Sequence, residues 1–158
     1  MRSVRSLLCV LVSALFVVSG AQAGSASDGQ GCKSINATGV GQDLGGGNTT
    51  ATISHDGRLN GTTSGHFDIS GAPPVFAING TVTFTTNHGT LVATVAGTFD
   101  VTTGAFTASG PVSGGTGKLA GASGTLTFSG VENLATGAFT ETITGSICGT
   151  HEDEDPEE

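Results

Sequence analysis

The chain has 158 residues, a formal net charge of −8 and 27 glycines, and it contains neither tryptophan nor tyrosine. Lys and Arg number only five, against 13 Asp and Glu residues. So acidic a chain repels phosphate backbones, which argues against nucleic acid as a partner, and it has no electrostatic attraction to an anionic membrane.

Residues 1–23 have the organisation of a secretory signal peptide. Arg2 and Arg5 precede an apolar run of about a dozen residues at 7–18, and Ala21-Gln22-Ala23 matches the small-x-small cleavage site. The apolar run is shorter than the roughly 20 residues that span a bilayer. We expect cleavage after Ala23, an extracellular or periplasmic location, and no membrane span in the mature protein. An uncleaved N-terminal anchor is the alternative.

The mature chain is long enough for one domain with a single core. We expect a flexible lead-in at 24–31, one β-barrel domain at 32–149 and a disordered acidic tail at 150–158. The tail carries six of the 13 acidic residues. The mature chain without it keeps three strong bases and seven acids, a net charge of 3 − 7 = −4.

Cys32 and Cys148 are the cysteines of the mature chain. In a secreted protein they are expected to form one disulfide between the two ends of the domain, and two free thiols are the alternative. The bond would make the first and last strands neighbours, as in a closed barrel.

Short alternating runs separated by glycine or by Asn/Asp-Gly turns are typical of an all-β fold. The predicted strands are 33–40, 49–54, 59–70, 75–86, 90–101, 105–112, 122–130 and 138–148, with a glycine loop at 42–47. Eight such strands favour a small closed antiparallel barrel, and a β-sandwich is the alternative.

One hairpin turn occurs twice in the predicted strand order. Residues 97–107 (GTFDVTTGAFT) align with residues 130–140 (GVENLATGAFT) at an offset of 33. In each copy Asp or Asn opens the turn and Gly closes it before Ala-Phe-Thr enters the next strand. Asp and Asn side chains accept hydrogen bonds from turn amides, and Gly tolerates a positive φ, so both copies predict the same tight turn.

The segment 114–126 (GGTGKLAGASGTL) resembles the GGTG(R/K)FxGAxG loop and strand of the allene oxide cyclase and dirigent barrels. Together with the stretch up to Cys148, it is more similar to secreted bacterial proteins with an allene oxide cyclase barrel-like domain, over residues 88–148. The resemblance implies an eight-stranded calycin-like barrel, often with a cavity. The plant families act on hydrophobic substrates and use pocket tyrosines, which this chain lacks, and none of their catalytic positions is matched here.

Glu141 is the candidate for chemistry. It alternates in phase with Phe139, Ile143 and Ile147, which points it into the apolar interior. A carboxyl group there would be desolvated, would have a raised pKa, and would suit a general acid/base or a polar ligand contact. A position at the barrel mouth, with access to solvent, is the alternative.

His66 and Asp68 are two residues apart on one strand face, the spacing of a metal or acid/base pair. They share that face with Asn60, Thr62 and Ser64, which favours the solvated exterior. No metal or cofactor site is predicted. The loop at 114–121 also lacks the Ser/Thr after Gly117-Lys118 that a phosphate-binding loop needs.

These observations favour a non-catalytic secreted barrel that binds a small hydrophobic ligand or serves as an extracellular structural module. The predicted ligand-lining residues are Phe84, Phe99, Phe106, Phe128 and Phe139. The alternative is an isomerase or cyclase of a hydrophobic substrate with Glu141 as its polar catalytic group. A solidly packed lumen would leave only the structural role, whereas an open pocket with Glu141 on its wall would favour the enzyme.

Overall fold

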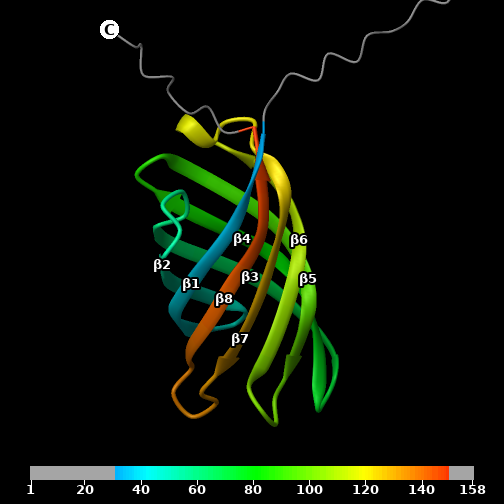
Figure 1. The fold of residues 1–158 in the computed structure, drawn as a ribbon. Helices are drawn as coiled ribbons and strands as arrows, with labels where there is room; N and C mark the ends of the chain where they lie inside the picture. The colour runs from blue at the N-terminus through cyan, green and yellow to red at the C-terminus, as the bar shows by residue number, and fades with distance from the viewer. Residues whose placement is uncertain (1–30, 150–158) are drawn as a thin grey trace, which may run out of the picture.

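The structure, a computed structural model, describes residues 31–149 as an eight-stranded barrel (Figure 1). The expected signal peptide, most of the lead-in and the acidic tail lie outside the described residues. The strands are β1 (Cys32–Gly45), β2 (Asn48–Ser54), β3 (Gly61–Ala72), β4 (Val75–Thr86), β5 (Gly89–Asp100), β6 (Ala105–Gly115), β7 (Ser123–Glu132) and β8 (Ala138–Cys148). A short 3₁₀ helix, η1 (Gly117–Leu119), lies between β6 and β7.

Each strand pairs antiparallel with the next, and β8 pairs with β1, which closes the barrel. The predicted closed barrel is therefore confirmed, and the sandwich alternative is excluded. Cys32 lies directly opposite Cys148 in the β1–β8 register, and the two are joined by a disulfide, as predicted. Such a bond fits an oxidising environment. Within residues 31–149 no helix is long and apolar enough to cross a bilayer.

The interior has one packed half, at the end that carries the disulfide. Leu59, from the β2–β3 turn, and Leu119, from η1, are fully buried there and close that end of the barrel. We call it the closed end, and the opposite end, with the β1–β2, β3–β4, β5–β6 and β7–β8 turns, the mouth (Figure 1). The other large, fully buried side chains are Phe84, Leu91, Leu126, Ile143 and Ile147.

Among the predicted boundaries that were wrong, two concern the turns at the ends of the barrel. β1 continues through residues 42–45, where a loop was expected. Gln42 pairs with both β2 and β8, and Asp43 and Gly45 pair with β2. The reversal is made instead by Gly45, Gly46 and Gly47, all with positive φ. Leu59 was placed in a strand but lies in a turn, held by hydrogen bonds from the Leu59 and Asn60 amides to the Asp56 carbonyl (3.1 and 2.9 Å).

The repeated turn is confirmed in atomic detail. The Asp100 carboxylate accepts a hydrogen bond from the Thr102 amide (2.7 Å), and the Asn133 side chain accepts the equivalent bond from Ala135 (3.0 Å). Gly104 and Gly137 close the two turns with φ of 75° and 73°. The two turns connect β5 to β6 and β7 to β8, and both lie at the mouth.

Candidate functional site

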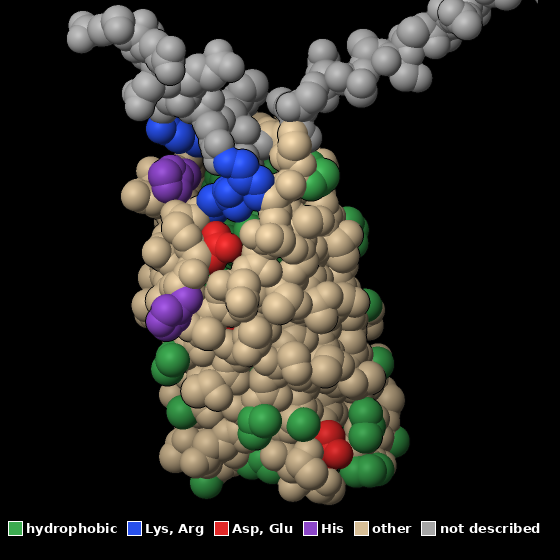
Figure 2. Space-filling model, in the orientation of Figure 1, with side chains coloured by type: hydrophobic (Ala, Val, Ile, Leu, Met, Phe, Trp, Pro, Cys, Tyr) green, Lys and Arg blue, Asp and Glu red, His purple; other side chains and the backbone are tan. Residues whose placement is uncertain are grey.

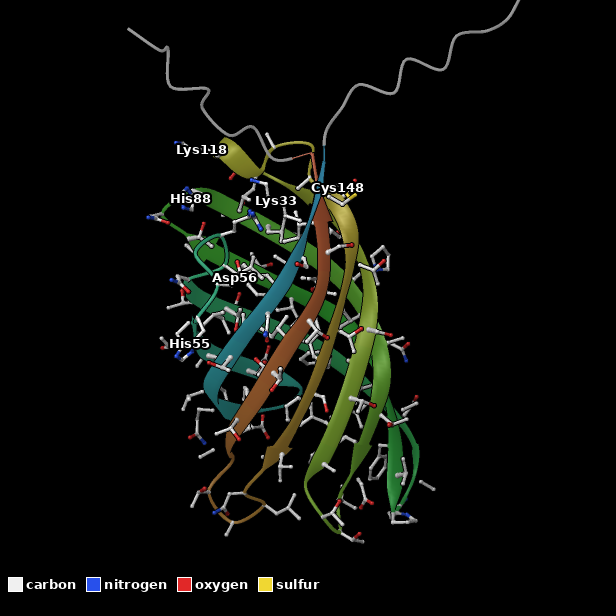
Figure 3. All side chains as sticks on the ribbon, in the orientation of Figure 1. Lys33, His55, Asp56, His88, Lys118 and Cys148 are labelled. Atoms are coloured by element: carbon white, nitrogen blue, oxygen red, sulfur yellow. A yellow bond between two sulfur atoms is a disulfide. The ribbon has the colours of Figure 1, made fainter. Side chains whose placement is uncertain are left out.

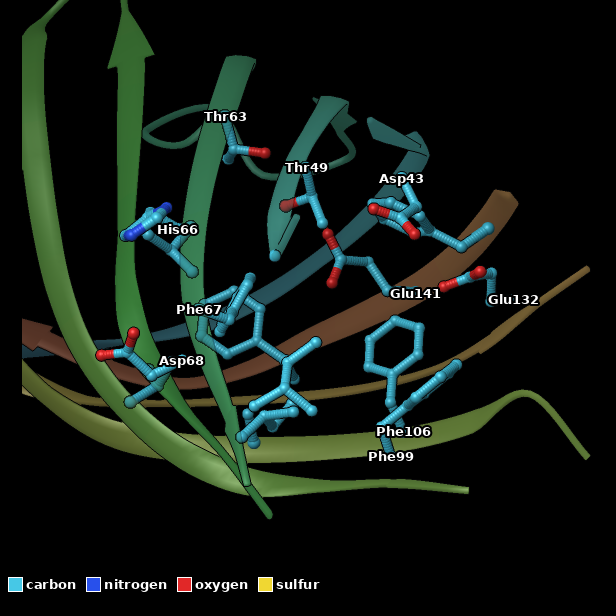
Figure 4. A pocket seen from close by; sticks show the side chains of 18 of the residues that line it. Asp43, Thr49, Thr63, His66, Phe67, Asp68, Phe99, Phe106, Glu132 and Glu141 are labelled. Atoms are coloured by element: carbon cyan, nitrogen blue, oxygen red, sulfur yellow. The ribbon is translucent and has the colours of Figure 1, made fainter. Parts of the chain in front are cut away.

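A cavity of about 510 Å³ fills the mouth half of the barrel and opens at the mouth (Figure 4). Its wall is mainly apolar and includes Ile78, Val82, Val95 and Ala108. The size lies within the range of small-molecule sites in proteins. The lumen is therefore packed at one end and hollow at the other.

Five phenylalanines line this cavity: Phe67, Phe99, Phe106, Phe128 and Phe139. Four of them were predicted on the lumen wall from strand phase. Phe84, predicted with them, does not line the cavity, because it lies in the packed half against Phe128 with ring centroids 6.2 Å apart. Phe106 and Phe139 meet edge to face at 5.7 Å and 90°, so two neighbouring rings of the wall hold one another in place.

Glycines on neighbouring strands provide the space for these rings. A Cβ atom on Gly41 would lie 2.3 Å from Cζ of Phe139, and one on Gly130 would lie 2.5 Å from Cζ of Phe106. Gly80 likewise lies beneath Phe67, where a Cβ would come within 2.8 Å of the ring. Aromatic rings that cover glycines of an adjacent strand are a known stabilising pair in sheets. These glycines therefore set the width of the cavity.

Glu141 lies on the cavity wall, between Phe139 toward the mouth and Ile143 in the packed half. Its side chain crosses the next strand at Gly39, where a Cβ would lie 2.7 Å from its Cγ and Oε1 atoms. From there it extends toward Thr49 of β2 (Figure 4). The side chain of Glu141 therefore points inward, as strand phase predicts.

Burial raises the pKa of Glu141 to about 7. Desolvation is the cause, since no hydrogen bond or ion pair to this carboxyl group occurs within the described part of the chain. A group with this pKa changes charge near neutral pH. It can accept or donate a proton, or bind a cationic or hydrogen-bonding group of a ligand.

Two more carboxylates line the cavity at the mouth, Asp43 of β1 and Glu132 of β7 (Figure 4). Partial burial, and then the negative charge of Asp43, raise the pKa of Glu132. The rim that carries them is tied together, because the Asp43 amide donates to the Gly137 carbonyl (2.8 Å) and Gln42 Nε2 donates to the Thr136 carbonyl (2.6 Å).

His66 and Asp68 lie on exposed positions of β3, in line with the expected exterior face. Both nevertheless border the cavity, because β2 begins only at Asn48 and leaves the lower part of β3 beside the opening. His66 Nδ1 lies 3.0 Å from the Asn48 side-chain oxygen. No group of three metal-ligating side chains occurs among residues 31–149, and the two do not form part of such a cluster.

Three residues that line the cavity were not among the predicted site residues. Phe67 was not among the predicted ligand-lining residues. Glu132 is in phase with Leu126 and Phe128, but its strand was predicted to end at 130. Asp43 lies in the stretch that was expected to be a loop. Had the first strand been predicted to continue past Asp43 and the seventh to Glu132, alternation would have placed both acids on the inward face.

A comparison of the chain with protein-family models finds no match, and a comparison with curated proteins finds none either. The similarity of residues 88–148 to allene oxide cyclase barrel-like domains therefore stays a prediction.

Proposed function

We propose that this protein is a secreted barrel of the allene oxide cyclase-like type that binds a small hydrophobic ligand in its open half. The observation that carries the proposal is the cavity of about 510 Å³ with five phenylalanines on its wall. An apolar ligand that enters it removes apolar surface from water on both sides, at roughly 25 cal/mol per Å². A purely structural module has no need of such a cavity.

The approach to the cavity is apolar as well. Leu44, Val75 and Leu134 lie in or beside the mouth turns and are 46–63% exposed. Figure 2 shows hydrophobic side chains gathered at the mouth end of the molecule. Exposed apolar groups around an open pocket are typical of a binding surface for hydrophobic molecules.

A cavity-filling substitution tests the proposal. Ala108 is buried on the cavity wall, and Ala96 is exposed on the outer face of the neighbouring strand β5. We expect the neutral fluorescent probe N-phenyl-1-naphthylamine to bind the wild-type protein saturably, at least 10-fold more weakly after Ala108→Phe, and unchanged after Ala96→Phe. The chain has no Trp or Tyr to interfere with the signal. Equal binding by both variants, or no saturable binding, would overturn the proposal.

Native mass spectrometry of protein purified from its own host complements this test. A co-purified small molecule that is absent from the Ala108→Phe variant would identify the natural ligand. Its retention by that variant would place the binding site elsewhere.

An isomerase or cyclase is the second candidate, and the Glu141 carboxyl group on the cavity wall favours it. A pKa of about 7 suits proton transfer at neutral pH. If the protein is such an enzyme, the ligand captured from the host is converted to an isomer of equal mass by the wild type and not by Glu141→Gln. A ligand recovered unchanged from both would leave binding as the function.

A further inference from the structure

The charges of the barrel are segregated along its axis. The three strong bases of the described chain are Lys33, Arg58 and Lys118, all in elements of the closed end (Figures 2 and 3). His88 lies near Lys33 and Lys118, and His55 lies farther down the barrel, below Asp56 (Figure 3). Of the six acids within residues 31–149, only Asp56 belongs to the closed end. The other five are Asp43, Asp68, Asp100, Glu132 and Glu141.

Four of these five acids line the cavity, and no Lys or Arg among the described residues does. Asp43 and Glu132 face the opening from β1 and β7, and Asp68 borders it from β3. His66 is the one histidine on the wall. A cleft of one charge sign with low-dielectric walls concentrates ligands of the opposite sign and repels ligands of the same sign. An anionic amphiphile such as a fatty acid is therefore disfavoured at this mouth.

The inner arrangement gives the same preference. Glu141 is two residues deeper on β8 than Phe139, about 7 Å farther along the strand. The carboxyl group has no hydrogen-bond donor within the described part of the chain, so its lone pairs are available to a ligand. The rings of Phe106 and Phe139 lie between it and the mouth, and aromatic faces attract cations. A positive group can thus be accommodated along the whole path inward.

We propose that the cavity takes a hydrophobic amine, whose ammonium group binds the Glu141 carboxylate and whose apolar body lies against the phenylalanines. This inference rests on the proposed binding function and names the ligand class of the same site. The apolar wall supplies the affinity, and the carboxylates supply the discrimination among alcohol, acid and amine of equal chain length.

Isothermal titration of the full chain with decylamine, decanol and decanoate tests the ligand class. At pH 8.5 we expect decylamine to bind at least 10-fold more tightly than decanol, and decanoate to bind most weakly. After Glu141→Gln the preference for the amine over the alcohol should fall below about 3-fold. Asp100→Asn is the matched control, because Asp100 is an acid of the mouth end that does not line the cavity, and it should change the preference less than 2-fold.

The same preference should depend on pH. Only the ionised carboxylate attracts the ammonium group, so we expect the amine-over-alcohol ratio to be smaller at pH 5.5 than at pH 8.5. Asp43, Asp68, Glu132 and His66 line the same cavity, and comparison with Glu141→Gln separates their contribution to the pH dependence from that of Glu141.

The outcomes distinguish the two proposals. Equal binding of decanol and decylamine would overturn the amine and leave the hydrophobic site intact. Tighter binding of decanoate would also overturn it. An amine preference that survives Glu141→Gln would show that Glu141 is not its partner. Failure of all three ligands to bind saturably, together with failure of the neutral probe, would overturn the binding function itself.

Discussion

At the scale of single residues, the absence of a side chain at Gly39 provides the space that the side chain of Glu141 occupies. The carboxyl side chain lies where a Cβ of Gly39 would be, so it can extend across β1 instead of folding back toward the mouth. The cost is desolvation of an acid without a protein partner, and that cost raises its pKa to about 7. Acids whose pKa is shifted by desolvation on a cavity wall are characteristic of functional sites.

The raised pKa of Glu141 predicts how stability changes with pH. The folded-state pKa lies above the ordinary 4.5 because burial disfavours the ionised carboxylate. The stability of the folded protein relative to the unfolded chain is therefore greatest below about pH 4.5, where Glu141 is protonated in both states, and this advantage is lost as the pH rises through about 7. We expect Glu141→Gln to be more stable than the wild type by up to about 3 kcal/mol at pH 8.5, and equally stable at pH 4. Urea unfolding followed by circular dichroism measures this, and a difference that does not change with pH would contradict it.

At the scale of elements, the shape of the cavity wall depends on where glycines lie opposite phenylalanines of the neighbouring strand. Gly41 of β1 lies beneath Phe139 of β8, and the backbone carbonyl of Thr50 on β2 is close on its other side. Alternation gives Gly41 and Phe139 the inward phase but does not say which inward residues leave a hollow. The cavity arises where small residues and flat rings share the wall.

This predicts that Gly41→Ala destabilises the barrel. The new methyl group would lie 2.5 Å from the Thr50 carbonyl oxygen, which is backbone and cannot rotate away, so overpacking should cost about 1–3 kcal/mol. Gly57→Ala is the matched control, because a Cβ there meets nothing within 4 Å, and it should change stability by less than about 0.5 kcal/mol. Equal urea midpoints for the two variants would refute the proposed role of Gly41.

Much of the architecture follows from local signals in the sequence. The repeated Asp/Asn…Gly turn and the inward phase of Glu141 depend on neighbouring residues or on strand parity. The Cys32–Cys148 pairing follows from the presence of two cysteines in the expected mature chain. The division of the lumen does not. Phe84 and Phe99 have the same residue type and the same phase, yet one is packed under the closed end and the other lines the cavity. The difference depends on Leu59 and Leu119, whose entry from a turn and from η1 no alternation pattern encodes.

At the scale of the whole molecule, the disulfide and the mouth lie at opposite ends of one barrel. The bond closes the β1–β8 seam over a loop of 116 residues, and its constraint acts mainly on the unfolded chain. Removing it should therefore lower stability without altering the shape of the site.

We expect Cys32→Ala/Cys148→Ala to lose about 2–5 kcal/mol of unfolding free energy. Under conditions where the variant remains folded, its affinity for N-phenyl-1-naphthylamine should stay within 2-fold of the wild type. Urea titration and probe titration together check both statements. A large loss of affinity in the folded variant would mean that the closed end and the cavity are structurally coupled.

The position of the chain ends has a practical and biological consequence. Cys32 and Cys148 are paired at the closed end, so the backbone enters and leaves the barrel at the same place, away from the four turns of the mouth. Whatever is attached through either end of the barrel, whether a fusion partner, a sensor surface or a neighbouring domain, leaves the opening directed outward into the medium. The fold is thus suited to being immobilised without obstructing the entry of a ligand.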